Sequence, residues 1–340
     1  DIPGIQRQVS SRSAILPQYF LDAFFSFEDE LPSIDALYER FADCFREEIA
    51  VECEKLRQCY RDWETQVSGI LRVDDCFLDG PIENARSWNQ GGVRYATLTC
   101  AITSLATAAD CFAAVDELVL RSRRVTLAEL QEALRNDFEG QEPLRQLCLN
   151  TVKFGQDDAL ADSHAVRLLD EVLAEIDRAS GLDTDEAVIV FRCLETDMRH
   201  VRIGATIGAT ADGRRAGQPI SENTSPYPGS CRRGLTSMLK SVSKLPLHGI
   251  NSGALNIRLQ PDLVAEEAGL DRLSALLRTY FDLGGLQCQL SVCSIEQLRE
   301  AQRHPEEHRD LMVRITGYSA VFVDMAPRAQ EEFIRREEMG

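Results

Sequence analysis

The sequence has little that would suit it to nucleic acid or to a membrane. Its 340 residues include 37 Lys and Arg against 55 Asp and Glu, for a formal net charge of -18. Sequence-independent binding to nucleic acid needs clustered basic side chains that neutralise phosphates. The basic residues here are dispersed, except for short pairs such as Arg123-Arg124 and Arg214-Arg215. No apolar run approaches the roughly 20 residues that span a bilayer. We therefore expect neither a nucleic-acid partner nor a membrane partner.

The chain has no visible signal peptide, and it begins at Asp1 rather than at a methionine. The start at Asp1 indicates a trimmed, processed or incomplete chain, and the cytoplasmic location that we expect follows from the thiols below. Its 11 cysteines include no CxxC pair. The spacings of Cys53 and Cys59, and of Cys288 and Cys293, are typical of neither zinc nor iron–sulfur sites. We expect buried free thiols in a reducing compartment, and no bound metal.

The sequence also lacks the common catalytic and phosphate-binding motifs. It contains no clear GxSxG elbow, P-loop or Rossmann fingerprint. His304 and His308 have the spacing of two metal ligands on one face of a helix. Pro305, however, suits the first turn of a helix, so we interpret His304 as a cap rather than as a ligand.

The first part of the chain, over residues 1–200, reads as mainly helical. Residues 33–63 carry apolar side chains at every third or fourth position, which predicts a long amphipathic helix. Thr126 and Glu129 form a capping box at the start of another helix. Further helices are predicted over 96–121, 160–180 and 183–200, with irregular structure over 1–32 and 64–95.

The composition changes after His200. Residues 204–234 are rich in glycine, proline and small polar side chains. A connection of this length is usually functional or packed against a specific surface. Beyond it the patterns predict alternating helices and strands: helices over 235–245, over 271–285 and from Ser294, and strands over 253–259 and 287–293.

Both predicted strands have one apolar face and one small or polar face. In the first strand Leu255, Ile257 and Leu259 alternate with the candidate substrate-contacting residues Ser252, Ala254 and Asn256 and with Arg258. The second strand alternates in the same way, with Leu286, Cys288, Leu290 and Val292 opposite Gln287, Gln289, Ser291 and Cys293. Two interpretations stay open: the polar faces meet solvent, or they line the interior of a barrel that the intervening helices cover.

A lone glycine, Gly317, lies between two strand-like runs in the sequence RITGYSA (residues 314–320). The flanking segments DLMVRI and YSAVFVDM are rich in β-branched and aromatic residues, and no turn residues surround the glycine. By itself such a glycine indicates a bulge, a tight bend or a close backbone approach.

Several segments together resemble the C-terminal part of glycyl radical enzymes, the family of pyruvate formate-lyase and its dehydratase and lyase relatives. RITGYSAVF is similar to the radical loop of that family, and ATADGRRAGQPISENTSPYPG to its glycine-rich segment. LTSMLKSVSKL, GGVRY, VTLAELQEALRNDFEG and LREAQRHPEEHRDLMVRITGYSA also resemble family stretches, in the family's order and spacing.

The resemblance implies a role for Gly317. In this family a separate activating enzyme, which uses S-adenosylmethionine and an iron–sulfur cluster, removes a hydrogen atom from the glycine α-carbon. Glycine suits this chemistry because it has no Cβ to crowd the radical centre. By resemblance, Gly317 stores the radical and passes it to a cysteine thiol, which then takes a hydrogen atom from a small-molecule substrate. The implied activity is a radical elimination or lyase reaction.

The chain departs from the family pattern at the cysteine. The family's catalytic cysteine lies in a glycine-flanked loop and is followed by a glutamate. Cys53 lies on the amphipathic helix, and Cys231 in PGSCRRG lacks that glutamate. We therefore expect the cysteine loop on a partner polypeptide or on a missing N-terminal part, with the active form a complex or oligomer. At 155–158 GQDD stands where relatives often have GND, Leu235 stands where many have proline, and Ser291 where many have asparagine.

The resemblance implies an α/β fold: the C-terminal half of a glycyl radical enzyme barrel. It divides the chain into a mainly helical part of the barrel (1–200), the glycine-rich segment with half-barrel strands (201–311) and a glycyl radical domain (312–340). Three alternatives remain. The chain could be a non-catalytic spare-part protein that replaces a damaged radical domain, although such proteins carry little beyond that domain. It could be an acyltransferase of the pyruvate formate-lyase type, or an acidic helical binding protein with a coincidental RITGYSA.

Overall fold

The structure is a computed structural model that describes residues 5–10, 14–66, 73–180, 188–194, 199–314 and 319–338. In these residues it has the following helices: α1 (Leu16–Phe25), α2 (Ile34–Gln66), α3 (Pro81–Asn84), α4 (Leu105–Val115), α5 (Leu127–Arg135), α6 (Glu142–Asn150), α7 (Ala159–Ser180), α8 (Arg199–Gly204), α9 (Leu235–Ser243), α10 (Glu267–Asp282), α11 (Ile295–Arg303) and α12 (Pro327–Glu338). The strands are β1 (Ile5–Ser10), β2 (Ala14–Ile15), β3 (Tyr95–Thr103), β4 (Val188–Leu194), β5 (Leu255–Leu259), β6 (Cys288–Val292), β7 (Met312–Arg314) and β8 (Ser319–Val321).

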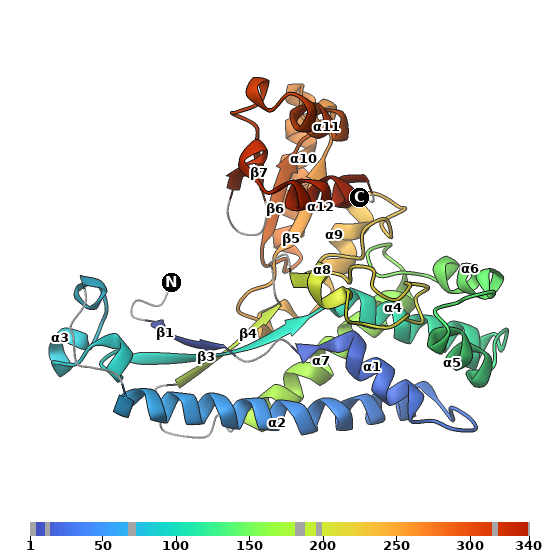
Figure 1. Ribbon diagram of the computed structural model, residues 1–340, viewed down its shortest axis with the longest axis horizontal. Coiled ribbons are helices and arrows are strands. Elements are labelled where there is room, and N and C mark those ends of the chain that lie inside the picture. Colours follow the sequence, from blue (N-terminus) through green and yellow to red (C-terminus); the bar gives the residue numbers. More distant parts are fainter. Residues whose placement is uncertain are drawn as a thin grey trace.

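A parallel sheet with β3 at its centre organises the larger part of the molecule. β1 and β2 pair with successive parts of β3, and β4 pairs with β3 from Ala96↔Val188 to Ile102↔Leu194. The long helix α2 and helices α1, α4 and α7 gather around this sheet (Figure 1). A second group, formed by β5, β6, β7, α10, α11 and α12, stands above it (Figure 1).

The sheet corrects three of the predictions. Residues 96–103 of β3 and residues 188–194 are strands, not parts of the helices predicted over 96–121 and 183–200. The supposedly irregular residues 1–32 contain β1, β2 and α1. The reason is burial: residues 99–103 of β3 are all buried, so both faces of the strand meet protein. A parallel strand covered on both faces shows no alternation, and its pattern cannot be told from that of a buried helix.

The helices predicted from local signals are confirmed. α2 turns Leu37, Phe41, Phe45 and Ile49 into the core, as the three- and four-residue spacing indicates. The Thr126 side chain accepts a hydrogen bond from the Glu129 backbone N–H, and the Glu129 carboxylate accepts one from the Thr126 backbone N–H. These contacts satisfy backbone groups at the start of α5, which no other part of the helix can reach.

A buried polar contact fixes α2 against α7. The Tyr38 ring stacks on Phe112 with its centroid 4.0 Å away, and its hydroxyl lies 3.0 Å from Nδ1 of His164. The other ring nitrogen of His164 lies 3.2 Å from the Asp116 carboxylate. Nε2–H therefore donates to Asp116, while Nδ1 accepts from Tyr38. Burial lowers the pKa of His164, which keeps the imidazole neutral in this role.

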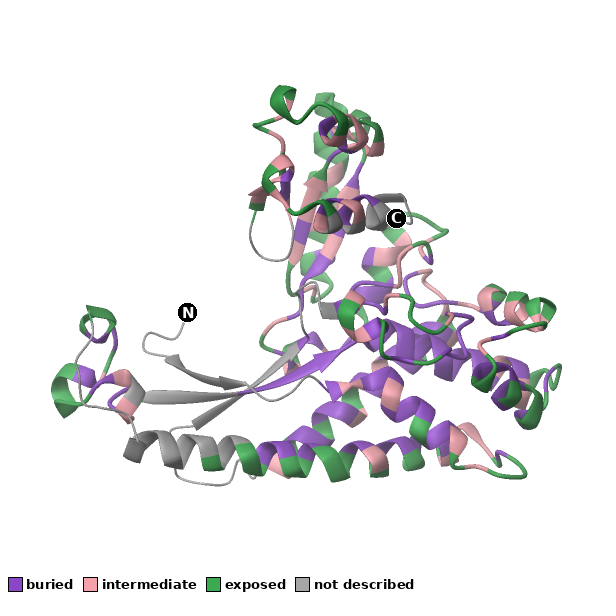
Figure 2. Ribbon diagram, in the orientation of Figure 1, coloured by how far each residue is buried: buried purple, intermediate pink, exposed green. Residues whose placement is uncertain are grey.

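Most cysteines follow the expectation of buried free thiols. Among the described residues Cys53, Cys100, Cys111, Cys148 and Cys293 are buried, Cys44, Cys231 and Cys288 are half-buried, and Cys76 is exposed. Burial is greatest around α4, α1 and α7, whereas the second group of elements is mostly half-buried or exposed (Figure 2). No helix in the described part of the chain is long and apolar enough to cross a membrane.

Candidate active site

The two strand-like runs around RITGYSA form a hairpin. β7 and β8 pair antiparallel, from Met312↔Val321 to Arg314↔Ser319. Residues 315–318, which include Gly317, connect the two strands and lie outside the described residues. The strand–glycine–strand prediction is therefore confirmed for the strands.

A small separate core anchors the base of this hairpin. Val313 and Phe322 are buried together with Leu298 of α11 and Phe333 of α12. The rings of Phe322 and Phe333 meet edge to face at 6.2 Å. Gln330 of α12 donates from its side-chain amide to the carbonyl oxygen of Phe322 at 3.0 Å. The hairpin is thus held at its strands by two helices.

The strands β5 and β6 confirm the predicted alternation on β5. They pair in parallel, with Asn256 opposite Gln289 and Arg258 opposite Ser291. Leu255, Ile257 and Leu259 are buried, and the side chains between them are half-buried. The apolar face of β6 is less well covered, since Val292 is 47% exposed. The polar face of β5 is the side that faces the glycine-rich segment.

A buried arginine holds the first half of the glycine-rich segment. Arg214 is 3% exposed, and its guanidinium donates to the carbonyl oxygens of Ile207, Gly208, Arg215 and Gln218. Four residues of the segment are therefore gathered around one planar group with fixed geometry. Arg145 of α6 also donates to the Gly213 carbonyl oxygen at 2.9 Å. The expectation that this long segment packs against a specific surface is confirmed.

Short polar contacts dock the second half of the segment between α4 and β5. The Ser221 hydroxyl accepts from the backbone N–H of Thr107, and the Ser221 N–H donates to the Thr107 hydroxyl, both at 2.9 Å. Thr224 donates through its hydroxyl to the Ala254 carbonyl oxygen at 2.9 Å, and the Ser225 hydroxyl accepts from the Asn256 N–H at 3.0 Å. Small hydroxyl side chains do this because a bulkier residue would separate the segment from the strand edge.

A pocket of about 450 Å³ lies where this segment meets β5 and α9. Its lining residues are Glu222, Ser225, Pro226, Tyr227, Pro228, Gly229, Cys231, Arg232, Gly234, Leu235, Met238, Asn256 and Arg258. We call it the β5 pocket. Nδ2 of Asn256 is a buried donor with no hydrogen-bond partner. An unsatisfied buried amide is costly, and a polar ligand in the pocket would offset that cost.

Two ionisable side chains meet at the wall of the β5 pocket. Glu222 is 5% exposed and His200, at the start of α8, is 4% exposed. Nδ1 of His200 lies 3.7 Å from Oε2 of Glu222. The Ile220 backbone N–H donates to the His200 carbonyl oxygen at 3.4 Å, which ties α8 to the segment that carries Glu222. Glu222 belongs to the glycine-rich segment that resembles the family, but His200 lies outside it, and the sequence gives no signal that the two residues meet through the folding of the segment.

Cys231 also lines the β5 pocket, so the structure places a thiol and the Glu222 carboxyl group in one cavity. Burial raises the pKa of the Cys231 thiol to about 11, which keeps it protonated. The thiol packs against Gly155, where an added Cβ would lie 3.0 Å from its Sγ and 2.4 Å from Cγ of Pro226. Gly155 has φ +95°, so glycine is required here by backbone conformation and by space.

The candidate substrate-contacting residues have different positions. Asn256 lines the β5 pocket. Ala254 is fully buried, and Ser252 is half-buried with its carbonyl oxygen accepting from the Leu194 N–H at 2.8 Å. Neither of these two is a lining residue of the pocket. The structure therefore brings only Asn256 of the three to the cavity wall.

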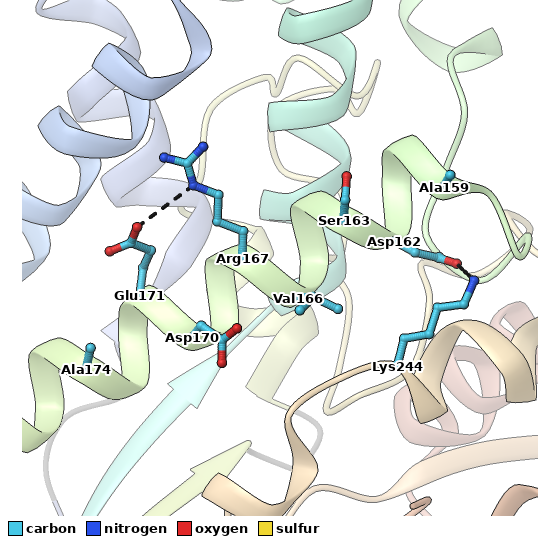
Figure 3. A pocket seen from close by; sticks show the side chains of 9 residues that line it. All are labelled: Ala159, Asp162, Ser163, Val166, Arg167, Asp170, Glu171, Ala174 and Lys244. Carbon is cyan, nitrogen blue, oxygen red and sulfur yellow. Dashed lines mark hydrogen bonds and ion pairs between the residues drawn. The ribbon is translucent and has the colours of Figure 1, made fainter. Parts of the chain in front are cut away.

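The described residues also line two further hollows at the surface. A cavity of about 230 Å³ lies on the other side of the Tyr227–Gly229 turn, next to Asp110 and Arg214. An open groove of about 710 Å³ follows α7, where Lys244 pairs with Asp162 at 2.6 Å (Figure 3). The groove shares no lining residue with the β5 pocket.

The prediction of His304 as a cap is confirmed, since it stands at the C-terminus of α11 and directly before the turn at Pro305–Glu307. Ligand-type atoms of His304, Glu306 and Glu307 lie within 4.8 Å of one another, but all three residues are exposed. Exposed acidic side chains commonly gather in this way without a metal.

Two protein families and several known proteins match this chain. Residues 20–188 match the family described as pyruvate formate lyase-like, and residues 220–323, which include Gly317, match the glycine radical family. The chain is 34% identical over 274 residues to a probable dehydratase of Escherichia coli, covering 78% of this chain and 33% of that protein. It is 33% identical over 272 residues to the trans-4-hydroxy-L-proline dehydratase of Clostridioides difficile, with the same coverage.

A solved structure agrees with these sequence matches. The glycerol-bound B12-independent glycerol dehydratase of Clostridium butyricum superposes with a TM-score of 0.85 at 26% identity, over 96% of this chain and 43% of that chain. This chain spans 33% of the length of each of the two curated relatives named above. Its α/β fold corresponds to part of a pyruvate formate-lyase-type barrel. The chain belongs to the glycyl radical enzymes.

Proposed function

We propose that this chain is the radical-storing subunit or fragment of a glycyl radical enzyme of the dehydratase and lyase branch. Gly317 holds the radical in a C-terminal radical domain over 312–340, while 1–200 and 201–311 form the barrel portion. The observation that carries the proposal is the match of residues 220–323 to the glycine radical family, with β7 and β8 flanking Gly317. The names of the relatives, dehydratases and sulfite-lyases, support that branch.

The β5 pocket is the part of the substrate site that this chain supplies. Asn256 contacts the substrate through its amide, which can donate and accept hydrogen bonds. Ser252 and Ala254 directly precede β5 and support Asn256 from behind the wall rather than lining the pocket. The cysteine that receives the radical lies outside this chain, on a partner polypeptide or on an N-terminal part. The complex, an oligomer in the cytoplasm, acts on a small molecule.

The activating partner is a separate radical enzyme. It supplies the S-adenosylmethionine and iron–sulfur chemistry that removes one hydrogen atom from the Gly317 α-carbon, and this chain itself needs no bound metal. The radical is stabilised by the two peptide groups beside the α-carbon. A side chain at this position would force the centre out of the plane of these groups, so only glycine serves.

Electron paramagnetic resonance tests the proposal directly. The anaerobically activated wild type should show a doublet from coupling to the single remaining α-hydrogen of Gly317, and the doublet should collapse when that glycine is dideuterated. Air should then cut the activated chain at Gly317 and release a piece that starts near Tyr318. Gly317→Ala should give neither signal nor activity in folded protein. An activated sample without a doublet, and without truncation in air, would refute the assignment.

A further inference from the structure

The cavity of about 230 Å³ behind the Tyr227–Gly229 turn has strongly charged walls, and the proposed function leaves it unused. We call it the α6 cavity. Its charged or ionisable lining residues, apart from Tyr227, are Asp110 of α4, Arg145 of α6, Lys153, Asp212, Arg214 and Arg232. Basic side chains outnumber carboxyl groups in this set, so the wall is positive even with both carboxyl groups ionised. One water molecule takes up roughly 30 Å³, so the cavity admits a larger occupant.

Arg214 of the α6 cavity leaves one of its donors unpaired. Both terminal nitrogens of its guanidinium donate to carbonyl oxygens of the glycine-rich segment. Its third nitrogen, Nε, is buried and has no hydrogen-bond partner. A guanidinium N–H can only donate, so the group that satisfies Nε must be an acceptor. Leaving such a donor buried and unpaired costs free energy that an acceptor in the cavity would recover.

The carboxyl group of Asp110 presents a second donor. Its Oδ1 accepts from the Phe154 backbone N–H at 2.7 Å, whereas Oδ2 is buried and has no hydrogen-bond partner. Burial raises the pKa of Asp110 to about 8, so the group is mostly protonated at neutral pH. Because Oδ1 already acts as an acceptor, the proton belongs on Oδ2. Two unpaired donors, from α4 and from the glycine-rich segment, therefore belong to the walls of one cavity.

Lys153 adds a buried positive charge to the same wall. It is 7% exposed, and its ammonium donates to the carbonyl oxygens of Cys148 and Thr151 and to the Thr151 hydroxyl. These partners are neutral, as are the carbonyl oxygens around the Arg214 guanidinium. Asp212 lines the cavity too, but it meets Arg214 at the backbone N–H, 3.3 Å away. In the described part of the chain neither buried cation forms a direct ion pair, which favours an anion as the occupant.

We propose that the α6 cavity binds a small oxyanion, whose oxygens accept hydrogen bonds from Nε of Arg214 and from the Asp110 carboxyl group. Lys153 and Arg145 supply the balancing positive charge. Inorganic phosphate and the carboxylate of a small metabolite share this chemistry. The site is separate from the radical chemistry, but it shares the Tyr227–Gly229 turn and Arg232 with the β5 pocket. A bound oxyanion therefore holds this turn from the side opposite the β5 pocket.

Isothermal titration calorimetry tests the site on this chain together with its cysteine-bearing part, without activation. The probes are inorganic phosphate and acetate, and chloride at equal ionic strength controls for screening. We expect at least one probe to bind saturably at a single site, with a Kd of about 1 mM or tighter. The tighter probe identifies a tetrahedral or a planar oxyanion as the ligand. Saturable binding of neither probe would overturn the proposal, whatever the outcome for the Gly317 radical.

Removing the positive charge of the wall should weaken the binding. Lys153→Gln should raise the Kd of the bound probe by about 10-fold or more. Arg145→Gln alters a half-buried side chain of α6 that does not line the β5 pocket, and it should raise the Kd by about 3-fold. It decides the matter if Lys153→Gln folds poorly. Arg124→Gln, at an exposed arginine before α5, is the matched control and should bind as wild type. Unchanged affinity in both cavity variants would overturn the proposal.

Two further variants fix the sign of the ligand's charge and its place. Asp110→Asn keeps a donor in the position of Oδ2, so it should bind the probe at least as tightly as wild type. Loss of binding in this variant would mean that the cavity needs a carboxylate, which an anion does not. Asn256→Leu should leave the Kd unchanged, whereas weaker binding there would place the probe in the β5 pocket instead. The bound probe should also slow amide hydrogen exchange over residues 227–232, and unchanged exchange at saturation would refute the site.

Discussion

Asp110 of α4 and Phe154 are joined by a hydrogen bond of 2.7 Å, in which the Phe154 backbone N–H donates to Oδ1 of the aspartate. Asp110 is fully buried, and its Oδ2 has no hydrogen-bond partner. Burial raises the pKa of Asp110 to about 8, against the lowering effects of Lys153 and of the Phe154 bond. Lys153 is the largest of the opposing influences, and its ammonium also donates to the carbonyl oxygens of Cys148 and Thr151.

The first prediction is a stability difference that depends on pH. The pKa of Asp110 is higher in the folded chain than its ordinary value of 3.8, so the folded state keeps a proton that the unfolded chain releases. The stabilisation of the folded state by the protonated Asp110 carboxyl group is complete below pH 3.8 and is lost as the pH rises towards about 8. Asp110→Asn does not titrate. The free energy of unfolding of the wild type relative to Asp110→Asn should therefore fall with rising pH, at up to about 1.4 kcal/mol per pH unit.

Urea unfolding of both proteins between about pH 5 and about pH 8 measures this difference. Other titrating groups are common to the two proteins and cancel. A difference in unfolding free energy that stays constant over this interval would mean that the Asp110 carboxyl group is ionised in the fold.

The second prediction concerns the contact of Gly155 with the β5 pocket. Gly155→Ala forces a Cβ to 2.4 Å from Cγ of Pro226 and towards the Cys231 thiol, at φ +95°. We expect the variant to lose more than about 2 kcal/mol of unfolding free energy, the cost of a positive φ plus a displaced turn. Pocket shape should change with it, so KM should rise. Gly140→Ala is the matched control: its φ is +70°, but nothing lies within 4 Å, so only about 1 kcal/mol is expected.

The third prediction separates substrate contact from radical storage. Asn256→Leu removes an amide from the β5 pocket and should lower turnover by at least about 10-fold, the value of one lost polar contact. The Gly317 doublet should keep its amplitude, because Asn256 lies on β5 rather than on the hairpin. Gln260→Leu, at an exposed amide just past the end of β5, should leave both unchanged. Equal loss of turnover and doublet in Asn256→Leu would indicate a folding role.

The fourth prediction concerns the isolated chain. Val292, Leu286 and Phe281 are between 41% and 47% exposed around β6 and the end of α10. Exposed apolar side chains of this size favour association. We expect the chain alone to be inactive and partly aggregated in size-exclusion chromatography, and to become monodisperse and active when the cysteine-bearing polypeptide is supplied. A lone monomer with full activity would disprove this.

The sequence by itself determined the elements that depend on neighbours along the chain. The apolar spacing of α2, the capping box of α5, the alternation of β5 and the strands around RITGYSA are all local patterns, and each can be read without knowing what covers it. The family could be recognised for the same reason: its motifs are contiguous. The position of Asn256 on the polar face of β5 also follows from a strand period of two.

Only the tertiary structure decided what depends on distant contacts. The C-terminal half of β3, residues 99–103, is covered on both faces, and that covering comes from elements elsewhere in the chain. Glu222, His200 and Cys231 share no sequence pattern, and in the sequence Ser252 and Ala254 share the period-two face of Asn256. Which of them reach the β5 pocket depends on how the glycine-rich segment folds back between α4 and β5. Side-chain hydroxyls and one buried arginine fix that path, and no local rule specifies their partners.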